Sequence, residues 1–203
     1  MSTLYLKFEL CSDWHIGNGK EAGAYADAMV LKDAHGLPYL PGKGIKGLLK
    51  EAFSLCAKNQ WFGDNSDALV NQLFGVEEYS GVEAQGMLQI SSGRLSDGEQ
   101  AYFIQHPDAK RYLYRVVQST AIDHESGVAL KGSLRSMEVV VPLVLEAEVT
   151  MNTAHPSYAA SGLTEELFSR YLSEAVTMIT SLGAKRHRGL GQVMVSVQPN
   201  SGE

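Results

Sequence analysis

A short segment that follows Pro41 combines cations with glycines at helical spacing. The lysines are Lys43, Lys46 and Lys50, and the glycines are Gly42, Gly44 and Gly47. Lysines at i, i+3 and i+7 share one face of a helix, opposite its apolar stripe. Free N–H groups at the helix start attract anions, and glycines let a ligand backbone approach closely. The segment therefore predicts a phosphate-binding site, and the alternative is a solvated lysine face beside a glycine turn.

A second cluster of cations lies in the glycine-flanked segment 183–191. Its basic residues are Lys185, Arg186, His187 and Arg188, with no acidic neighbour. Such a loop between a helix and a strand suits contact with backbone phosphates without readout of bases. Glycines on both sides indicate close packing or a special backbone conformation. We interpret the loop as a phosphate-binding site, and the alternative is an exposed basic loop that aids solubility.

Two carboxylates, Asp27 and Asp33, lie in an irregular, glycine-containing stretch. A lone carboxylate in such a stretch usually forms a turn or caps a helix, so the residues alone leave any catalytic role open. The six histidines lack the spacing of metal ligands, which argues against a dedicated metal site. Neither a G-x-S-x-G elbow nor a Cys–His signature is present, so acyl-transfer chemistry has no support.

The composition is that of an acidic globular protein. Lys and Arg number 17 against 23 Asp and Glu, the formal net charge is −6, and 44% of residues are hydrophobic. This balance excludes wholesale disorder and a protein that coats nucleic acid by bulk charge, so such binding must come from local clusters. Without a membrane-spanning apolar stretch, a secretory signal or a cysteine pair, we expect a cytoplasmic chain with no membrane partner.

Hydrophobic periodicity predicts the elements that must position these residues. Period-2 alternation predicts strands at 4–10, 87–91, 112–117, 139–151 and 193–197, and period 3.6 predicts helices at 43–58, 67–74 and 164–182. Thr164 would cap the last helix and Gly183 would end it. The order corresponds to an α+β, ferredoxin-like βαββαβ plan in a single domain, residues 1–203. Three long insertions interrupt it, at approximately 12–36, 57–85 and 93–136.

Several segments resemble, in order, the RAMP (repeat-associated mysterious protein) superfamily. More narrowly, they resemble the repeated backbone subunit of type III CRISPR effector complexes. The N-terminal signature is matched by 15–17, 27–33 and 36–47, which includes the Pro-Gly-x-x-x-Lys-Gly element at 41–47. The later matches are 73–75, 86–90, 120–129 with 136–140, and the glycine-rich loop 183–191.

The resemblance implies a modified ferredoxin-like domain of the RNA-recognition-motif type, whose insertions form a lid and, near 119–135, a thumb-like hairpin. It also implies the partners: guide (CRISPR) RNA, target RNA, copies of the chain in a filament, other RAMP subunits and the large polymerase-like CRISPR subunit. The family's backbone subunits grip the guide along its backbone and act as metal-dependent endoribonucleases on target RNA, in antiviral defence.

Site residues follow from the same resemblance. Asp27 occupies the position of the family's catalytic, metal-binding aspartate, with Asp33 as the fallback, and Mg²⁺ or Mn²⁺ is expected to bind only with RNA. Where family members commonly have two serines, this chain has Lys43-Gly44, so an ionic contact with phosphate is expected there. The residues expected to bind RNA are His15, Lys43, Gly44, Lys46, Lys50, Arg135, Lys185, Arg186, His187 and Arg188.

Three alternatives stay open. The chain could be a non-catalytic RAMP subunit that caps or bridges the complex, or a guide-precursor-processing endoribonuclease with His15 or His35 in a metal-independent site. A structural or nucleotide-binding protein outside the superfamily is the third. Asp27 favours a backbone subunit that cuts target RNA over the non-catalytic subunit. The Pro-Gly-x-x-x-Lys-Gly helix start argues against the guide-precursor-processing endoribonuclease.

Overall fold

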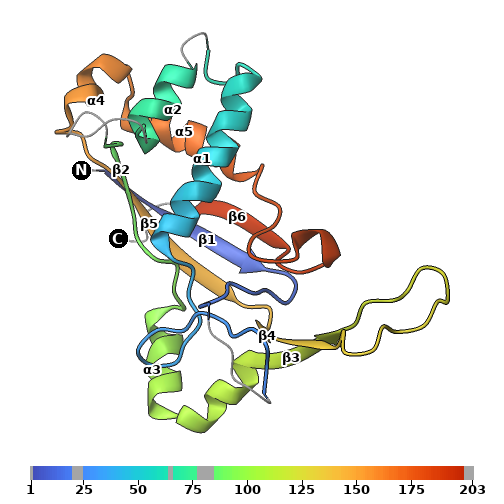
Figure 1. Cartoon of the computed structure of the whole chain (residues 1–203). Helices are drawn as coiled ribbons and strands as arrows, with labels where there is room; N and C mark the ends of the chain where they lie inside the picture. Colours follow the sequence, from blue (N-terminus) through green and yellow to red (C-terminus); the bar gives the residue numbers. More distant parts are fainter. Residues whose placement is uncertain (1, 20–24, 64–65, 77–84, 199–203) are drawn as a thin grey trace.

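An antiparallel sheet of four strands forms the centre of the molecule (Figure 1). Its strands, in order across the sheet, are β2 (Leu88–Ile90), β5 (Val144–Met151), β1 (Ser2–Leu10) and β6 (Val193–Gln198). The structure, a computed structural model, describes residues 2–19, 25–63, 66–76 and 85–198. The mixed α/β class with antiparallel sheets agrees with the prediction from the sequence.

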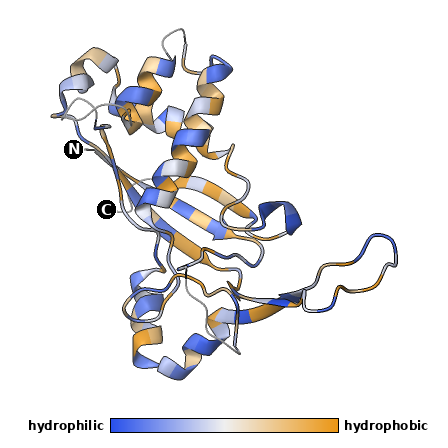
Figure 2. Ribbon diagram, viewed as in Figure 1, coloured by the Kyte–Doolittle hydropathy of each residue, from blue (hydrophilic) through white to orange (hydrophobic). Residues whose placement is uncertain are grey.

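Helices cover one face of this sheet, and the hydrophobic core lies between the two layers (Figure 2). Helix α1 (Gly42–Lys58) connects β1 to β2, and α5 (Glu165–Val176) connects β5 to β6. The sheet contributes alternate residues to the core, such as Leu6 and Phe8, while Glu146 and Glu148 stay exposed on the open face. This is the alternation of a half-buried strand.

Two further helices flank α1 and α5. Helix α2 (Ser66–Phe74) packs on α1, and α4 (Pro156–Ser161) packs on α2. The ring of Phe53 in α1 lies 5.2 Å from that of Phe62 and 5.3 Å from that of Phe74, so aromatic contacts fill this end of the core. Part of the insertion expected at 57–85, and with it part of any lid, lies outside the described residues.

The second sheet is a two-stranded ribbon of β3 (Tyr114–Ser119) and β4 (Arg135–Val140). It follows α3 (Asp97–Gln105) and the 3₁₀ helix η2 (Pro107–Leu113). Its strands end in register at Ser119 and Arg135, and the intervening loop projects away from the body of the molecule (Figure 1). Val128 and Leu130 are 63% and 50% exposed, which confirms the expectation of a protruding hairpin rather than a segment of the core.

Removal of the hairpin loop should leave the domain folded. We expect replacement of residues 120–134 by Asn-Gly, which closes a two-residue turn between paired strands, to shift the melting temperature by less than about 2 °C. The reason is that this loop contributes no residue to the core. Differential scanning calorimetry checks this, and loss of a cooperative transition would show that the loop stabilises the fold.

The continuous strand predicted at 139–151 is wrong, because the run is divided between the two sheets. Strand β4 ends at Val140 and β5 begins at Val144, and Pro142 lies between them. Proline has no N–H for a sheet ladder and is excluded from the interior of a paired strand. Instead, the Val141 N–H donates to Leu113 O (3.0 Å), and Leu143 O accepts from the Leu10 N–H (2.9 Å).

The helix predicted from Thr164 to Leu182 is confirmed at its start and wrong at its end. The Thr164 hydroxyl accepts a hydrogen bond from the Leu167 N–H, as a helix cap does, but the helix ends at Val176. Ile179 and Leu182 are buried beyond it. The intervening chain turns to pair with the start of β6, so Gly183 serves the following loop and not the helix end.

No helix in the described ranges is both long and apolar enough to cross a bilayer.

Candidate nucleic-acid interface

The start of α1 is fitted closely against the segment that follows β2. A Cβ at Gly42 would collide with Ile90 O, so no other residue fits there without displacement of the backbone. The Gly42 N–H donates to the Ser92 hydroxyl (3.2 Å), which satisfies one free donor of the helix start. The Pro-Gly pair therefore fixes the position of α1 on the sheet.

The three lysines of α1 line a groove of about 580 Å³ beside α2 and β2. Lys43 is exposed, whereas Lys46 and Lys50 are half-buried, each with its Nζ 3.3 Å from a backbone carbonyl, Leu88 O and Gly75 O respectively. Burial and the neighbouring Lys50 lower the pKa of Lys46. The alternative of a fully solvated lysine face therefore does not describe Lys46 and Lys50, whose ammonium groups bond to backbone carbonyls at the wall of the groove.

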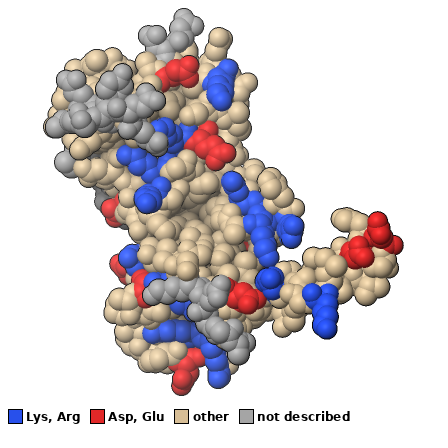
Figure 3. All heavy atoms as spheres, viewed as in Figure 1, with Lys and Arg blue, Asp and Glu red and all other residues tan. Residues whose placement is uncertain are grey.

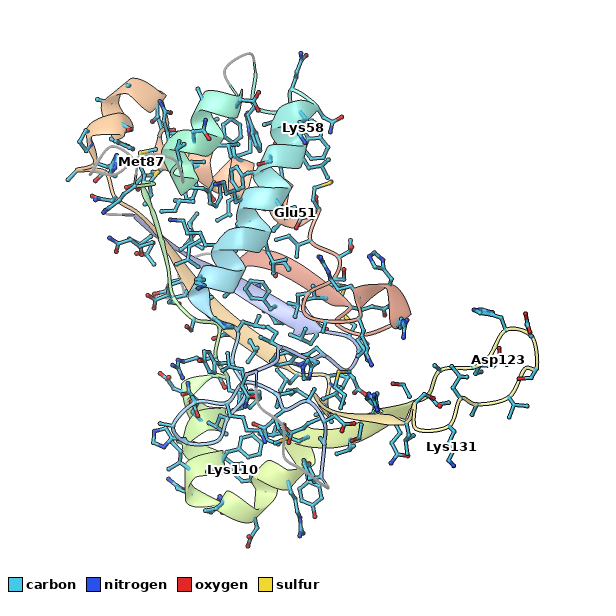
Figure 4. All side chains as sticks on the ribbon, in the orientation of Figure 1. Glu51, Lys58, Met87, Lys110, Asp123 and Lys131 are labelled. Atoms are coloured by element: carbon cyan, nitrogen blue, oxygen red, sulfur yellow. The ribbon has the colours of Figure 1, made fainter. Side chains whose placement is uncertain are left out.

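A strip of bare helix backbone separates this groove from a second hollow. Gly44 and Gly47 are exposed, and a Cβ at either would meet nothing within 4 Å. Gly47 lines both the lysine groove and the second hollow of about 310 Å³, whose far side includes Gly183 and Arg186. One turn beyond Gly47, Glu51 points from α1 (Figure 4), and its carboxylate limits the strip because it would repel an anionic backbone.

The basic loop has an unusual backbone that explains its glycines. Gly183, Gly189 and Gly191 have φ of +78°, +82° and +71°. Lys185 also has a positive φ, +55°, a conformation that residues other than glycine rarely adopt. The Ala184 N–H donates to His15 O (2.8 Å) and the Gly191 N–H to Asp13 O (2.7 Å). The loop is therefore pinned at both ends, with all four of its basic side chains exposed, Lys185, Arg186, His187 and Arg188.

Cations thus gather at two places on one face of the molecule. Figure 3 shows them over α1 and over the loop before β6, on either side of a hollow. Arg135 is also exposed, at the base of the hairpin. The structure therefore brings the two predicted phosphate-binding clusters to the same surface, on either side of the glycine strip.

His15 lies inside the fold, which contradicts its expected contact with RNA. It is 5% exposed, and its Nδ1 lies 2.7 Å from Glu138 O. Because its backbone carbonyl also holds the basic loop, His15 connects that loop to β4. Its sequence position gave no sign of this role, since a histidine in an irregular segment fits an exposed site equally well.

Asp33 forms a turn and an ion pair, which contradicts its role as a fallback catalytic group. Its Oδ1 accepts hydrogen bonds from the backbone N–H groups of His35 and Leu37, both at 2.9 Å, and its Oδ2 lies 3.0 Å from Nη1 of Arg94. Both oxygens are therefore occupied by structural contacts. An aspartate whose carboxylate accepts a hydrogen bond from the backbone N–H two residues later forms an Asx turn, a common structural role for this residue.

Asp27 is exposed and is held at one carboxylate oxygen. Its Oδ2 accepts hydrogen bonds from the Ser136 N–H (2.6 Å) and the Ser136 hydroxyl (3.1 Å). These bonds, and the charge of Arg135, lower the pKa of the Asp27 carboxyl, so it stays ionised at neutral pH. No donor among the described residues reaches Oδ1, which leaves this oxygen available to a ligand.

Glu138, which the sequence analysis did not single out, anchors the segment that carries Asp27. It is 1% exposed, and its carboxylate contacts Lys32 Nζ (2.8 Å) and the Val30 N–H (3.2 Å). The Lys32 ammonium also lies 3.8 Å from the ring centroid of Tyr114, whose pKa is raised by burial and by Glu138 and Asp33. Polar residues at 136 and 138, among the valines of a strand, were the signal that could have revealed this support.

Comparisons with known proteins agree with this architecture. A family model described as the RAMP superfamily matches residues 7–194. A chain of the "Type III-B Cmr-beta" cryo-EM structure bound to cognate target RNA aligns with a TM-score of 0.65 at 12% identity, over 97% of both chains. A chain of the apo-state structure aligns with a TM-score of 0.65 at 13% identity, over 98% of both. No curated protein matches the sequence.

Proposed function

The chain belongs to the RAMP superfamily, and from this premise we propose that it is a backbone subunit of a cytoplasmic type III CRISPR effector complex. In this role it binds guide RNA along the RNA backbone, assembles with copies of itself and other subunits, and cuts complementary target RNA. The observation that carries the proposal is the bare strip at Gly44 and Gly47, with cations on both sides.

The strip suits a sugar–phosphate backbone for a geometric reason. Without side chains at these two positions, an RNA backbone can lie directly on α1, with Lys43 on one side and Arg186 on the other. Cations that contact phosphates give affinity without sequence preference, which is what a subunit needs if base pairing reads the target. Glu51 would repel the backbone beyond this point and so direct its path.

We infer that the unit β1-α1-β2-β5-α5-β6 is the expected ferredoxin-like βαββαβ domain. The strand order β2-β5-β1-β6, with both helices on one face, supports this inference. The open face of the sheet, where an RNA-recognition motif would stack bases on aromatic residues, carries the exposed carboxylates Glu146 and Glu148. The RNA therefore belongs on the helix side, and the β3–β4 hairpin is the thumb-like element.

Asp27 is the residue that we propose for catalysis. Its ionised carboxylate, whose Oδ1 accepts no bond from the described residues, fits a hard cation that takes its remaining ligands from RNA phosphates and water. Mg²⁺ or Mn²⁺ bound there would neutralise charge on the scissile phosphate and help to activate the attacking oxygen, the ribose 2′-hydroxyl.

A non-catalytic subunit is the second candidate. The contacts between Asp27 and Ser136 would also suit an aspartate whose only role is to hold its segment on β4. The burial of His15 counts against a precursor-processing nuclease centred on this histidine. His35 remains exposed.

Purification of the native assembly tests the proposed function. We expect the chain to copurify with a discrete small RNA and with other subunits, and the assembly to cut RNA complementary to that guide when Mn²⁺ is present. A native chain that is monomeric and free of nucleic acid would contradict the proposal. Guide and target binding without cutting in Mn²⁺ would favour the non-catalytic candidate.

A substitution on the glycine strip should separate binding from folding. Gly47→Glu adds a side chain where a Cβ meets nothing, and it replaces a poor helix former, so we expect an unchanged or higher melting temperature. The same side chain would block and repel the RNA backbone, and we expect guide binding to weaken by about tenfold or more.

The matched control is Gly98→Glu in α3, where a Cβ also meets nothing and which lines neither the lysine groove nor the second hollow. It should bind guide RNA as the wild type does, measured for both variants by filter binding. Equal affinity of Gly47→Glu and wild type would show that RNA does not lie on the strip.

A further inference from the structure

Strand β4 is paired along both of its edges. One edge pairs with β3 over Arg135–Val140, and at the other edge the N–H groups of the even-numbered residues donate to the N-terminal part of the chain. The Glu138 N–H donates to Ala28 O and the Val140 N–H to Trp14 O, both at 2.9 Å. The segment that carries Asp27 is therefore held against the edge of β4, at the base of the hairpin.

Ser136 and Asp27 form the most closely bonded pair along this edge. The Asp27 N–H donates to Ser136 O (2.9 Å) and to the Ser136 hydroxyl oxygen (3.2 Å). In return, the Ser136 N–H and hydroxyl both donate to Asp27 Oδ2. The hydroxyl therefore accepts from the backbone and donates to the side chain of the same residue, which fixes both its own proton and the carboxylate.

We propose that Ser136 is a positioning residue that fixes the orientation of the Asp27 carboxylate, an inference that rests on the proposed function. With Oδ2 held by two donors, rotation of the carboxylate is restricted, and Oδ1 is the oxygen left to meet a metal ion. An exposed aspartate without this clamp would sample several rotamers, and only some of them would place an oxygen against a metal beside the scissile phosphate.

The proposed positioning of Asp27 depends on the hydroxyl of residue 136, so the test compares variants that keep or remove this hydroxyl. Ser136→Ala retains the backbone donor and removes the side-chain donor, whereas Ser136→Thr retains both. Ser133→Ala is the matched control, because Ser133 lies in the same hairpin and, within the described part of the chain, its hydroxyl bonds only to Thr120, Ala121 and Leu130. Asp27→Ala serves as the reference for complete loss.

The experiment uses the assembled complex with guide and target. One readout is the Mn²⁺ concentration that gives half the maximal cutting rate. The other is Mn²⁺ bound to complexes whose target carries 2′-deoxyribose at the scissile position, measured by electron paramagnetic resonance. For Ser136→Ala we expect about a tenfold higher half-maximal Mn²⁺ concentration and correspondingly weaker Mn²⁺ binding, with target affinity unchanged. Ser136→Thr and Ser133→Ala should behave as the wild type.

The outcomes separate this inference from the proposed function. If wild type cuts, Asp27→Ala does not, and Ser136→Ala matches the wild type in both readouts, the positioning role is overturned while the proposed function stands. If the wild-type complex neither cuts nor binds Mn²⁺, the catalytic role of Asp27 and the inference fall together. A loss in Ser136→Thr equal to that in Ser136→Ala would also overturn the role of the hydroxyl.

Discussion

Complexes that contain Asp27→Ala should bind guide and target RNA almost as the wild type does and should fail to cut. The carboxylate makes no favourable contact with an anionic backbone, so its loss costs little binding. Its removal takes away the one protein oxygen that we propose beside the scissile phosphate. We expect the single-turnover rate to fall by at least about a hundredfold, as for other groups that stabilise charge at a reacting centre.

The control for this prediction is Asp33→Asn. Because Asp33 bonds to its own turn and to Arg94, we expect this variant to melt at a lower temperature and still cut. Cleavage at the wild-type rate by Asp27→Ala complexes would exclude Asp27 as the catalytic group. If both variants lost cutting while target binding stayed intact, catalysis would depend on the structure of the whole segment that carries Asp27 and Asp33, and not on the Asp27 carboxylate alone.

The second large effect should come from the basic loop. Neutralisation of Lys185, Arg186 and Arg188 together would remove the three phosphate contacts that we propose for this loop. For single-stranded RNA each such contact contributes about 0.7 to the salt slope of the binding constant. We expect the slope to fall by about 2, and affinity at about 0.1 M salt to fall by about a hundredfold, equally for all guide sequences. Titrations at several salt concentrations measure both quantities.

The backbone conformation of the basic loop determines which substitutions remove its charge without straining its backbone. Lys185 has φ of +55°, so Lys185→Gly relieves the backbone where alanine would be strained, and Arg186→Ala with Arg188→Ala changes only exposed side chains. A control that neutralises Lys58, Arg111 and Arg170 removes the same charge elsewhere. Sequence-dependent loss would show that the loop reads bases, and an effect equal to the control would show that it aids only solubility.

The sequence predicted those helices whose start and apolar stripe are encoded by residues close together in the chain. Helix α1 has an apolar stripe with Pro41-Gly42 at its start, and the observed bounds, Gly42–Lys58, differ from the prediction by one residue. The cap of α5 at Thr164 is equally local. Helix α3 escaped prediction because none of its described residues is buried, so it has no apolar periodicity to detect.

Features that depend on distant pairing could not be predicted. In the run 139–151 the apolar alternation continues with unchanged parity across Pro142. The proline marks an interruption of the strand but not the change of sheet, which depends on pairing with β3 and β1. The bonds between Asp27 and Ser136 join residues 109 positions apart. His15 was assigned to the surface because its buried partner, Glu138 O, is 123 positions away.

The bare strip on α1 has a consequence for laboratory evolution of this chain. Glycine is the poorest helix former after proline, and alanine at Gly44 or Gly47 would raise helix stability by about 1 kcal/mol each with no steric conflict inside the protein. A library selected for heat resistance without RNA would therefore accumulate alanine at both positions and, under the proposed function, lose affinity for the RNA backbone. The same library selected while bound to RNA would keep both glycines.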